Sequence, residues 1–241
     1  VPPVVKAFLA TLAVVDDLLA ILVIAIFYAG DLHWGYLMAG LGIFALLLLF
    51  NRSGLKHMAF YLLPGIAMWY FIHHSGVHAT IAGVLTAMAI PARSKKGSPL
   101  KRLVHQLNNP VNYLIMPVFA IANTNIHLSG DLLGNLDSKL SLGIVLGLVI
   151  GKPVGISLAS WLSVRLKIGH LPHGLSWPLI AGIGLMAGIG FTMSVFMSAL
   201  SFGDSVYSGE AKLSVLLASG FSAVMGLIYL RQIIRRQLLN G

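Results

Sequence analysis

The chain has 241 residues, of which 57% are hydrophobic and only 10% are charged, against about 25% charged residues in an average soluble domain. It carries a formal net charge of +9 and no cysteine, which excludes a disulfide framework and thiolate metal sites. This composition excludes an ordinary soluble domain, and apolar runs of about 20 residues predict an all-α, polytopic membrane protein.

Eight apolar segments are predicted to span the membrane as helices of a single transmembrane domain covering residues 1–241. The chain begins without an initiator Met or a signal peptide, so we expect an upstream part of the protein as well. The predicted spans are 4–29, 35–50, 57–74, 77–91, 109–126, 141–163, 178–201 and 211–230.

Charged residues are distributed unequally between the two sides of these segments. Thirteen basic residues and no acidic ones flank one side, whereas two basic and five acidic residues flank the other. The positive-inside rule places the basic flanks, and with them both ends of the chain, in the cytoplasm. The positive charge is therefore interpreted as an orientation signal that also suits anionic lipids, and not as a nucleic-acid surface.

Asp16 and Asp17 are adjacent carboxylates in the middle of the first span. Lys6 and Asp31, which mark the two ends of that apolar run, lie about 15 Å and 21 Å from the pair along a helix axis. The pair is therefore near the middle of the bilayer, where an ionised group is costly unless it faces protein, water or a cation. This placement predicts a functional site, with a packing role as the alternative.

A lysine is predicted at a similar depth on the sixth span. Lys152 lies thirteen residues from both Lys139 and Arg165, about 20 Å along the helix in either direction. It needs a counter-charge, and Asp16 and Asp17 are the carboxylates predicted at that depth. Pro153 should free the carbonyl of Val149 one turn earlier. A stripe of small residues on the same span predicts close helix packing: Gly143, Gly147, Gly151 and Gly155.

The seventh span predicts a discontinuous helix. Four glycines fall within nine residues from Gly182 to Gly190, followed by Thr192 and Ser194. Unwound backbone at this depth is tolerated where it is buried in protein or lines a cavity. Close glycine packing in an unbroken helix is the alternative.

These residues suit the exchange of a cation for protons. A hard monovalent cation prefers oxygen ligands, which a carboxylate, Thr192 and freed carbonyls could supply. Consecutive helical residues point about 100° apart, so one aspartate could bind the ion while the other pairs with Lys152. Protons and the cation would then compete for the same oxygen atoms, so that binding one expels the other.

Four motifs resemble those of the NhaA-type sodium/proton antiporters: V-V-D-D-L at 14–18, S-G-V-H-A-T-I-A-G-V at 75–84, I-G-K-P-V-G-I at 150–156 and G-I-G-F-T-M-S at 188–194. The resemblance covers essentially the whole chain and implies the last eight of the family's twelve helices. It therefore implies part of an inverted-repeat antiporter fold that contains a discontinuous helix.

The resemblance also implies a role for each matching residue. Asp17 would be the main sodium-binding carboxylate, Asp16 its neighbour in ion and proton exchange, and Lys152 the charge partner of Asp16. His78 matches a histidine linked with the response to pH. The discontinuous-helix site would comprise Gly188, Gly190, Thr192 and Ser194.

The function implied is a secondary transporter, not an enzyme, that exchanges sodium for protons without a cofactor in a bacterial inner membrane and so serves sodium and pH homeostasis. Lithium as a second cation, the stoichiometry and a homodimer are left open. Val104 stands where family members often carry a glutamate implicated in pH sensing, so the pH-activation profile is left open too.

Two other functions fit parts of the sequence. His74 and His78 are four residues apart, a spacing that could serve a transporter of divalent metals such as zinc or manganese. An intramembrane aspartyl protease would need two carboxylates that face each other from separate helices and share a proton. Asp16 and Asp17 diverge from one helix, which disfavours the protease.

Overall fold

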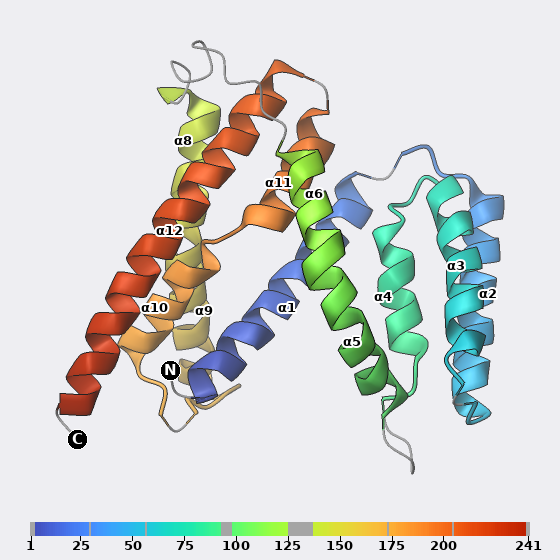
Figure 1. Ribbon diagram of the computed structural model, residues 1–241, viewed down its shortest axis with the longest axis horizontal. Helices are drawn as coiled ribbons and strands as arrows, with labels where there is room; N and C mark the ends of the chain where they lie inside the picture. The colour runs from blue at the N-terminus through green and yellow to red at the C-terminus, as the bar shows by residue number, and fades with distance from the viewer. Residues whose placement is uncertain are drawn as a thin grey trace. The chain divides into compact units, whose positions relative to one another are not determined.

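The computed structural model describes residues 3–28, 30–55, 57–92, 98–124, 137–172, 174–203 and 205–239. Every regular element in these ranges is a helix (Figure 1). The chain forms two compact units, one made of Val1–Leu18 and Ala122–Gly241 and the other of Leu19–Ile121. The long helix α1 (Pro3–Phe27) contributes its first part to one unit and its second part to the other.

The unit Leu19–Ile121 is built on three neighbouring helices, α2 (Trp34–Arg52), α3 (Ala59–His74) and α4 (Thr80–Ala89) (Figure 1). Leu47, Tyr61 and Met68 are fully buried among them. A Cβ atom at Gly65 would lie 2.9 Å from Thr86 Cγ2, so the glycine allows α3 and α4 to approach closely. Apolar burial and close glycine contacts thus join these helices, and Asn51 Nδ2 of α2 also donates to Ala89 O of α4 at 2.8 Å.

A continuous helical run follows, which lies in the same unit up to Ile121 and is made of α5 (Pro99–Pro110), the π-turn η1 (Val111–Ile115) and α6 (Met116–Asn123). It begins well before the predicted span 109–126. The reason is local, because the Ser98 hydroxyl accepts a hydrogen bond from the Lys101 amide and Pro99 occupies the first turn, both of which favour a helix start. Leu100 and Leu103 pack against the core of α2, α3 and α4.

Two connections of this unit are joined through their backbones. Gly30 N donates to Gly76 O at 2.9 Å, and His33 N donates to Ser75 O at 3.0 Å. Gly76 has a φ of +84°, and a Cβ atom there would collide with the carbonyl group of Asp31. Only glycine combines this conformation with such a close backbone approach.

We expect Gly76→Ala to lower the free energy of unfolding by about 2 kcal/mol or more, because it adds a backbone collision to a strained positive φ. Gly54→Ala is the matched control, since Gly54 has a φ of +73° with open space around it and should cost only about 1 kcal/mol. Thermal unfolding in detergent measures both. Equal losses in the two variants would contradict the predicted collision.

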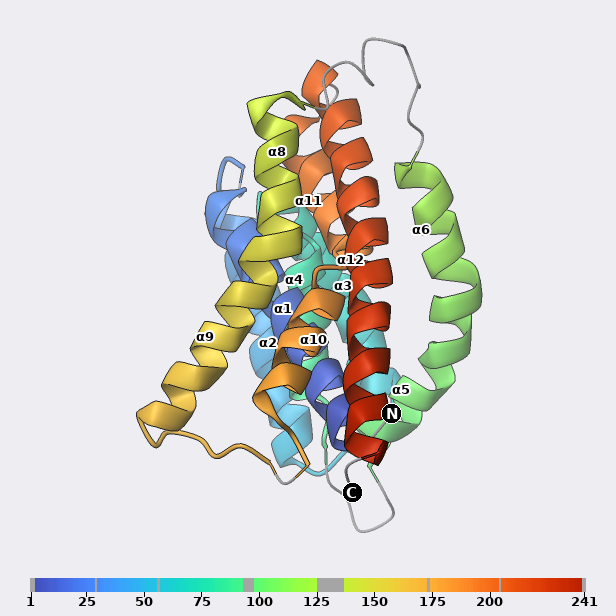
Figure 2. The same ribbon diagram turned by 90° about the vertical axis from the view of Figure 1, so that its left-hand side faces the viewer.

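The other unit contains a second continuous helical run, made of α8 (Lys139–Leu146), the π-turn η3 (Gly147–Gly151) and α9 (Lys152–Arg165). It also contains α10 (Trp177–Ala187), α11 (Phe191–Phe202) and α12 (Val206–Leu239). α12 packs along α8, α10 and α11 (Figure 2). Val5 of α1 is buried beside Leu179 and Ile180, and Leu230 and Ile233 pack against the same cluster.

The glycine stripe predicted to promote packing does not contact another element. Gly143, Gly147 and Gly155 have open space where a side chain would begin, and the nearest atom at Gly151 belongs to its own helical run. Close approaches on this run occur instead at Leu148, and at Pro153, whose Cα would lie 2.9 Å from a Cβ atom at Gly184 of α10. The packing interpretation was therefore wrong among the described residues, because the stripe lies on the exposed side of the run.

A buried carboxylate joins α8 to α12. Glu210 is 4% exposed, and it accepts hydrogen bonds from the hydroxyl groups of Ser138 and Ser141. Ser214 Oγ donates to the carbonyl oxygen of Glu210 at 2.8 Å. Ser138 is also the N-cap of α8, where a carboxylate is favoured by the helix dipole. Glu210 was counted among the acidic residues that flank the predicted spans, and the structure buries it in the contact between α8 and α12.

Four helical stretches are long and apolar enough to cross a membrane. α10 and α11, which meet at a bend of 46°, would together make a fifth. The predicted all-α, polytopic membrane fold is therefore confirmed, and so is the break in the seventh span. The count of eight spans and the inverted repeat stay predictions.

Candidate cation and proton site

The structure brings Asp16 and Lys152 together. Lys152 Nζ donates to Asp16 Oδ2 at 2.5 Å, with the side chains 26% and 50% exposed, respectively. Asp16 lies on α1, and Lys152 is the first residue of α9, directly after the π-turn η3. The ion pair thus links two apolar helices. Asp17 is the one other charged residue close to it in the sequence of either helix.

Asp17 follows Asp16 on α1, and its side chain is turned to a different direction of the helix. Among the described residues, Asp17 forms no ion pair, since Lys152 pairs with Asp16. The two carboxylates therefore have different surroundings, as the sequence predicted: Asp16 pairs with the Lys152 ammonium group, and Asp17 does not. The other carboxylate has oxygen atoms that could bind a proton or a metal cation.

The break between α10 and α11 lies in the same unit. α10 ends with the Gly188 amide donating to the carbonyl oxygens of Gly184 and Leu185, and α11 begins where the Ser194 amide donates to Gly190 O at 2.7 Å. Gly188 and Gly190 are buried, and a Cβ atom at Gly188 would lie 2.6 Å from the carbonyl oxygen of Leu148. Glycine is needed here for close approach to another backbone.

The π-turn η3 changes the helical register directly before Pro153. In an α-helix Pro153 would stand opposite Val149, as the sequence predicted. In η3 the Lys152 amide donates to Gly147 O, five residues earlier, so the residue opposite Pro153 in this register is Leu148. A π-turn adds one residue to the helical repeat, so Leu148 is a further residue whose carbonyl Pro153 cannot serve, and the expectation for Val149 stays a prediction.

The other predicted site residues lie in two places. Thr192 and Ser194 are half-buried in the first turn of α11, and within the described residues no hydrogen bond joins them to either aspartate. His78 lies in the connection between α3 and α4, in the unit Leu19–Ile121.

The described residues contain no group of three or more His, Asp or Glu side chains arranged to hold a metal ion. The His74 ring, one of the two proposed metal ligands, packs against Tyr36 and Tyr70. Its Nδ1 lies 2.9 Å from the carbonyl oxygen of Tyr70. These contacts favour a structural role for His74 over the divalent-metal alternative.

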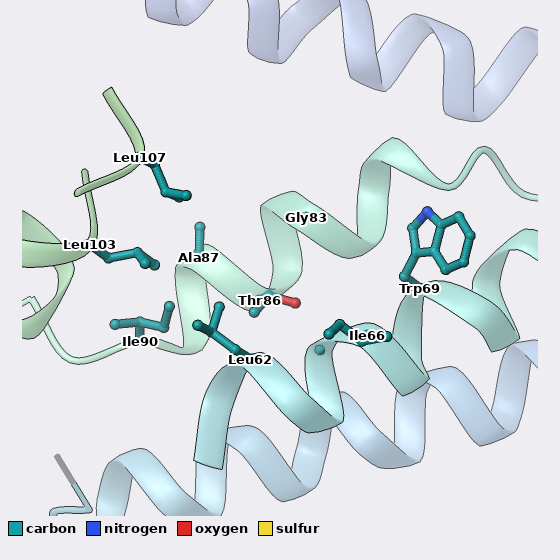
Figure 3. A pocket seen from close by; sticks show the side chains of 10 residues that line it. Leu62, Ile66, Trp69, Gly83, Thr86, Ala87, Ile90, Leu103 and Leu107 are labelled. Atoms are coloured by element: carbon teal, nitrogen blue, oxygen red, sulfur yellow. The ribbon is translucent and has the colours of Figure 1, made fainter. Parts of the chain in front are cut away.

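An apolar groove of about 330 Å³ lies between α3, α4 and α5. Leu62, Ile66 and Trp69 line it from α3, Thr86 lines it from α4, and Ile90 lines it directly after the end of α4 (Figure 3). Leu103 and Leu107 close it from α5. It contains none of the charged residues discussed above, so it offers no chemistry for ion exchange.

Sequence reasoning missed two groups of polar residues, the Glu210 cluster and Ser222 of α12. Ser222 is fully buried and faces Gly188, where a Cβ atom would lie 2.6 Å from its hydroxyl oxygen. Neither group has a sequence signal, because single serines are common in membrane helices and their orientation depends on packing.

Fold and site together define a polytopic helical membrane protein that carries an intramembrane carboxylate–lysine pair and a broken helix. A family model described as Na+/H+ antiporter 1 matches residues 1–230. The chain belongs to this family of Na+/H+ antiporters.

Curated relatives are similar over almost the whole chain. Na(+)/H(+) antiporter NhaA 2 of Flavobacterium johnsoniae is 55% identical over 95% of this chain and 57% of its own length. Na(+)/H(+) antiporter NhaA of Escherichia coli O1:K1 / APEC is 46% identical over 96% of this chain and 60% of its own length. The NhaA of Flavobacterium psychrophilum is 45% identical over 100% of this chain and 63% of its own length. The chain thus spans 57–63% of the length of these relatives.

Proposed function

We propose that the protein exchanges sodium ions for protons across a bacterial inner membrane. The observation that carries the proposal is the ion pair between Lys152 and Asp16, which leaves the neighbouring Asp17 outside any ion pair among the described residues. Three bacterial relatives named Na(+)/H(+) antiporters support it. Lithium, another hard monovalent cation, is a second candidate substrate.

The proposed chemistry is competition for carboxylate oxygens. When Asp17 is ionised, its two oxygens bind a sodium ion, and when it is protonated the site loses the charge that attracts the ion. Lys152 neutralises Asp16, so that one negative charge remains for the cation at a depth where an unpaired charge is costly. Exchange requires that protonation and sodium binding exclude each other, and no cofactor takes part.

The remaining site residues enter the proposal through their positions. Thr192 and Ser194 supply hydroxyl groups to the first turn of α11, beyond the buried glycines Gly188 and Gly190. His78 would respond to pH from the connection between α3 and α4. The basic flanks and both ends of the chain would face the cytoplasm and the anionic lipids of that leaflet. A homodimer is compatible with this arrangement.

The test uses everted membrane vesicles from a strain that lacks its own sodium/proton antiporters and expresses the protein from its whole gene. Respiration acidifies the vesicles and quenches a pH-sensitive dye. Adding sodium should restore fluorescence, because protons leave as sodium enters, whereas adding choline should not. If neither sodium nor lithium restores fluorescence in vesicles that contain the inserted protein, cation/proton exchange is excluded.

A further inference from the structure

Lys152, whose ammonium group pairs with Asp16, directly follows the π-turn η3 and directly precedes Pro153. A π-turn adds one residue to the helical repeat, and one residue corresponds to a rotation of about 100° around the helix axis. The direction in which the Lys152 side chain leaves its helical run therefore depends on whether the turn before it is a π-turn or an α-turn.

Two glycines on the neighbouring helix show the effect of the added residue. A Cβ atom at Gly188, the C-cap of α10, would lie 2.6 Å from Leu148 O, and a Cβ atom at Gly184 would lie 2.9 Å from Pro153 Cα. The glycines are four residues apart, which is one α-helical turn, whereas the residues that they contact are five apart, which is one π-turn. The same side of the run thus faces α10 at Leu148 and at Pro153.

A regular α-helix would place a different residue against Gly184. With Leu148 held beside Gly188, the residue one α-turn later is Lys152, so its side chain would leave the run on the side that packs against α10. No acidic residue occurs in α10, and the pair with Asp16 would be lost. The added residue of η3 puts Pro153 against Gly184 instead and leaves Lys152 free to pair with Asp16.

The first half of the run is held in place by α11 and α12. Leu148 is 9% exposed, in an apolar cluster with residues of both helices. Ser141 of α8 donates to the buried carboxylate of Glu210 at 3.0 Å. Rotation of α8 would break these buried contacts, so a change of register in η3 would displace Lys152, whose side chain is 26% exposed.

Pro153 favours the π-turn over the α-turn, because in an α-helix its ring would clash with the carbonyl group four residues earlier. The π-turn η1 ends in the same way: the Met116 amide donates to Val111 O, and Pro117 follows. Proline alone is not sufficient, since Pro64 lies inside α3 without a π-turn. At Pro153 the fit of the run to two glycines adds to the preference.

We propose that Pro153 is a positioning residue, which keeps η3 in the π register and thereby directs Lys152 to Asp16. Its role in exchange rests on the proposed function. Its effect on the ion pair does not, because unfolding measures the pair without transport.

The readout is the coupling between Lys152→Ala and Asp16→Asn in a double-mutant cycle, measured by unfolding in detergent of the protein expressed from its whole gene. In the unchanged protein this coupling should be about tenfold in the folding equilibrium constant. Pro153→Ala restores an amide and removes the ring, which favours the α-turn. In this background the coupling should fall below about threefold.

Pro117→Ala is the matched control, because Pro117 follows η1 as Pro153 follows η3, and no charged residue lies beside it in the sequence. It makes the same change in the same kind of turn, so it reports any general effect of losing a proline from a helix. The coupling between Lys152→Ala and Asp16→Asn should remain about tenfold in this background.

A rescue by register separates positioning from a general effect on helix stability. Deleting Ile150, which is 53% exposed, from the Pro153→Ala variant leaves position 153 one α-turn after Leu148, so a regular helix again places it against Gly184. The coupling should then return to about tenfold. Deleting Leu158 instead, which is 59% exposed and follows Lys152 in the run, should not restore it.

These outcomes together would support the positioning role. An unchanged coupling in Pro153→Ala, or an equal loss in Pro117→Ala, would overturn it. So would a failure of the Ile150 deletion to restore the coupling, or an equal recovery with the Leu158 deletion. A protein that moves no sodium in vesicles but shows this pattern would contradict the proposed function and still support the register.

Discussion

Asp17→Asn is expected to abolish the sodium-induced recovery of dye fluorescence in everted vesicles. Asparagine has nearly the size of aspartate, so the packing of α1 should be preserved. Its amide carries no charge at any pH in the working range, so it can neither release a proton when sodium arrives nor neutralise the ion at membrane depth. The initial rate should fall to that of vesicles without the protein.

Asp31→Asn is a suitable control, because it makes the same chemical change on an exposed residue in the connection between α1 and α2. Its exchange rate should match that of the unchanged protein. Both variants should be quantified in the membrane, so that a failure of insertion is not mistaken for a loss of exchange. Sodium-dependent recovery of fluorescence in Asp17→Asn at the unchanged rate would remove Asp17 from the proposed mechanism.

The sequence predicted the features that depend on charge and on glycine content. A carboxylate pair and a lysine in the middle of apolar runs are conspicuous, and their mutual need for a counter-charge predicted that Lys152 pairs with one of the two aspartates. The choice of Asp16, which the structure shows, came from the family resemblance. The cluster of glycines up to Gly190 likewise predicted the break between α10 and α11. Both inferences rest on the high cost of unpaired polar groups in a membrane.

Features that depend on helical register could not be predicted. The π-turn η3 shifts the register by one residue, so that Leu148 stands opposite Pro153, and no residue type by itself signals that shift. The four-residue spacing of the glycine stripe is typical of helix packing, but the spacing does not say whether the stripe faces another helix. That depends on where the neighbouring helices lie. No sequence pattern marks Ser222, because its position beside Gly188 depends on how α12 packs against α10.

Lys152→Ala and Asp16→Asn are expected to be coupled in their effects on stability. Their side chains are 26% and 50% exposed, and an exposed pair in water contributes only about 0–1 kcal/mol. At membrane depth, however, each single change leaves the opposite charge without its partner, which is more costly than losing both. We therefore expect the double variant to be more stable than the sum of the single changes predicts, by about 1–2 kcal/mol.

Lys139 provides the control for this cycle, because it lies on the same helical run as Lys152 but about 20 Å away along the axis. Lys139→Ala and Asp16→Asn should be additive within about 0.5 kcal/mol. Additivity of Lys152→Ala with Asp16→Asn would contradict the ion pair as an energetic link. Because unfolding is measured without transport, the cycle tests the pair independently of exchange. Repeating it in Asp17→Asn should leave the coupling unchanged if Lys152 serves Asp16 alone, and should strengthen it if the lysine shares its charge between both carboxylates, because Asp16 would then be its one remaining partner.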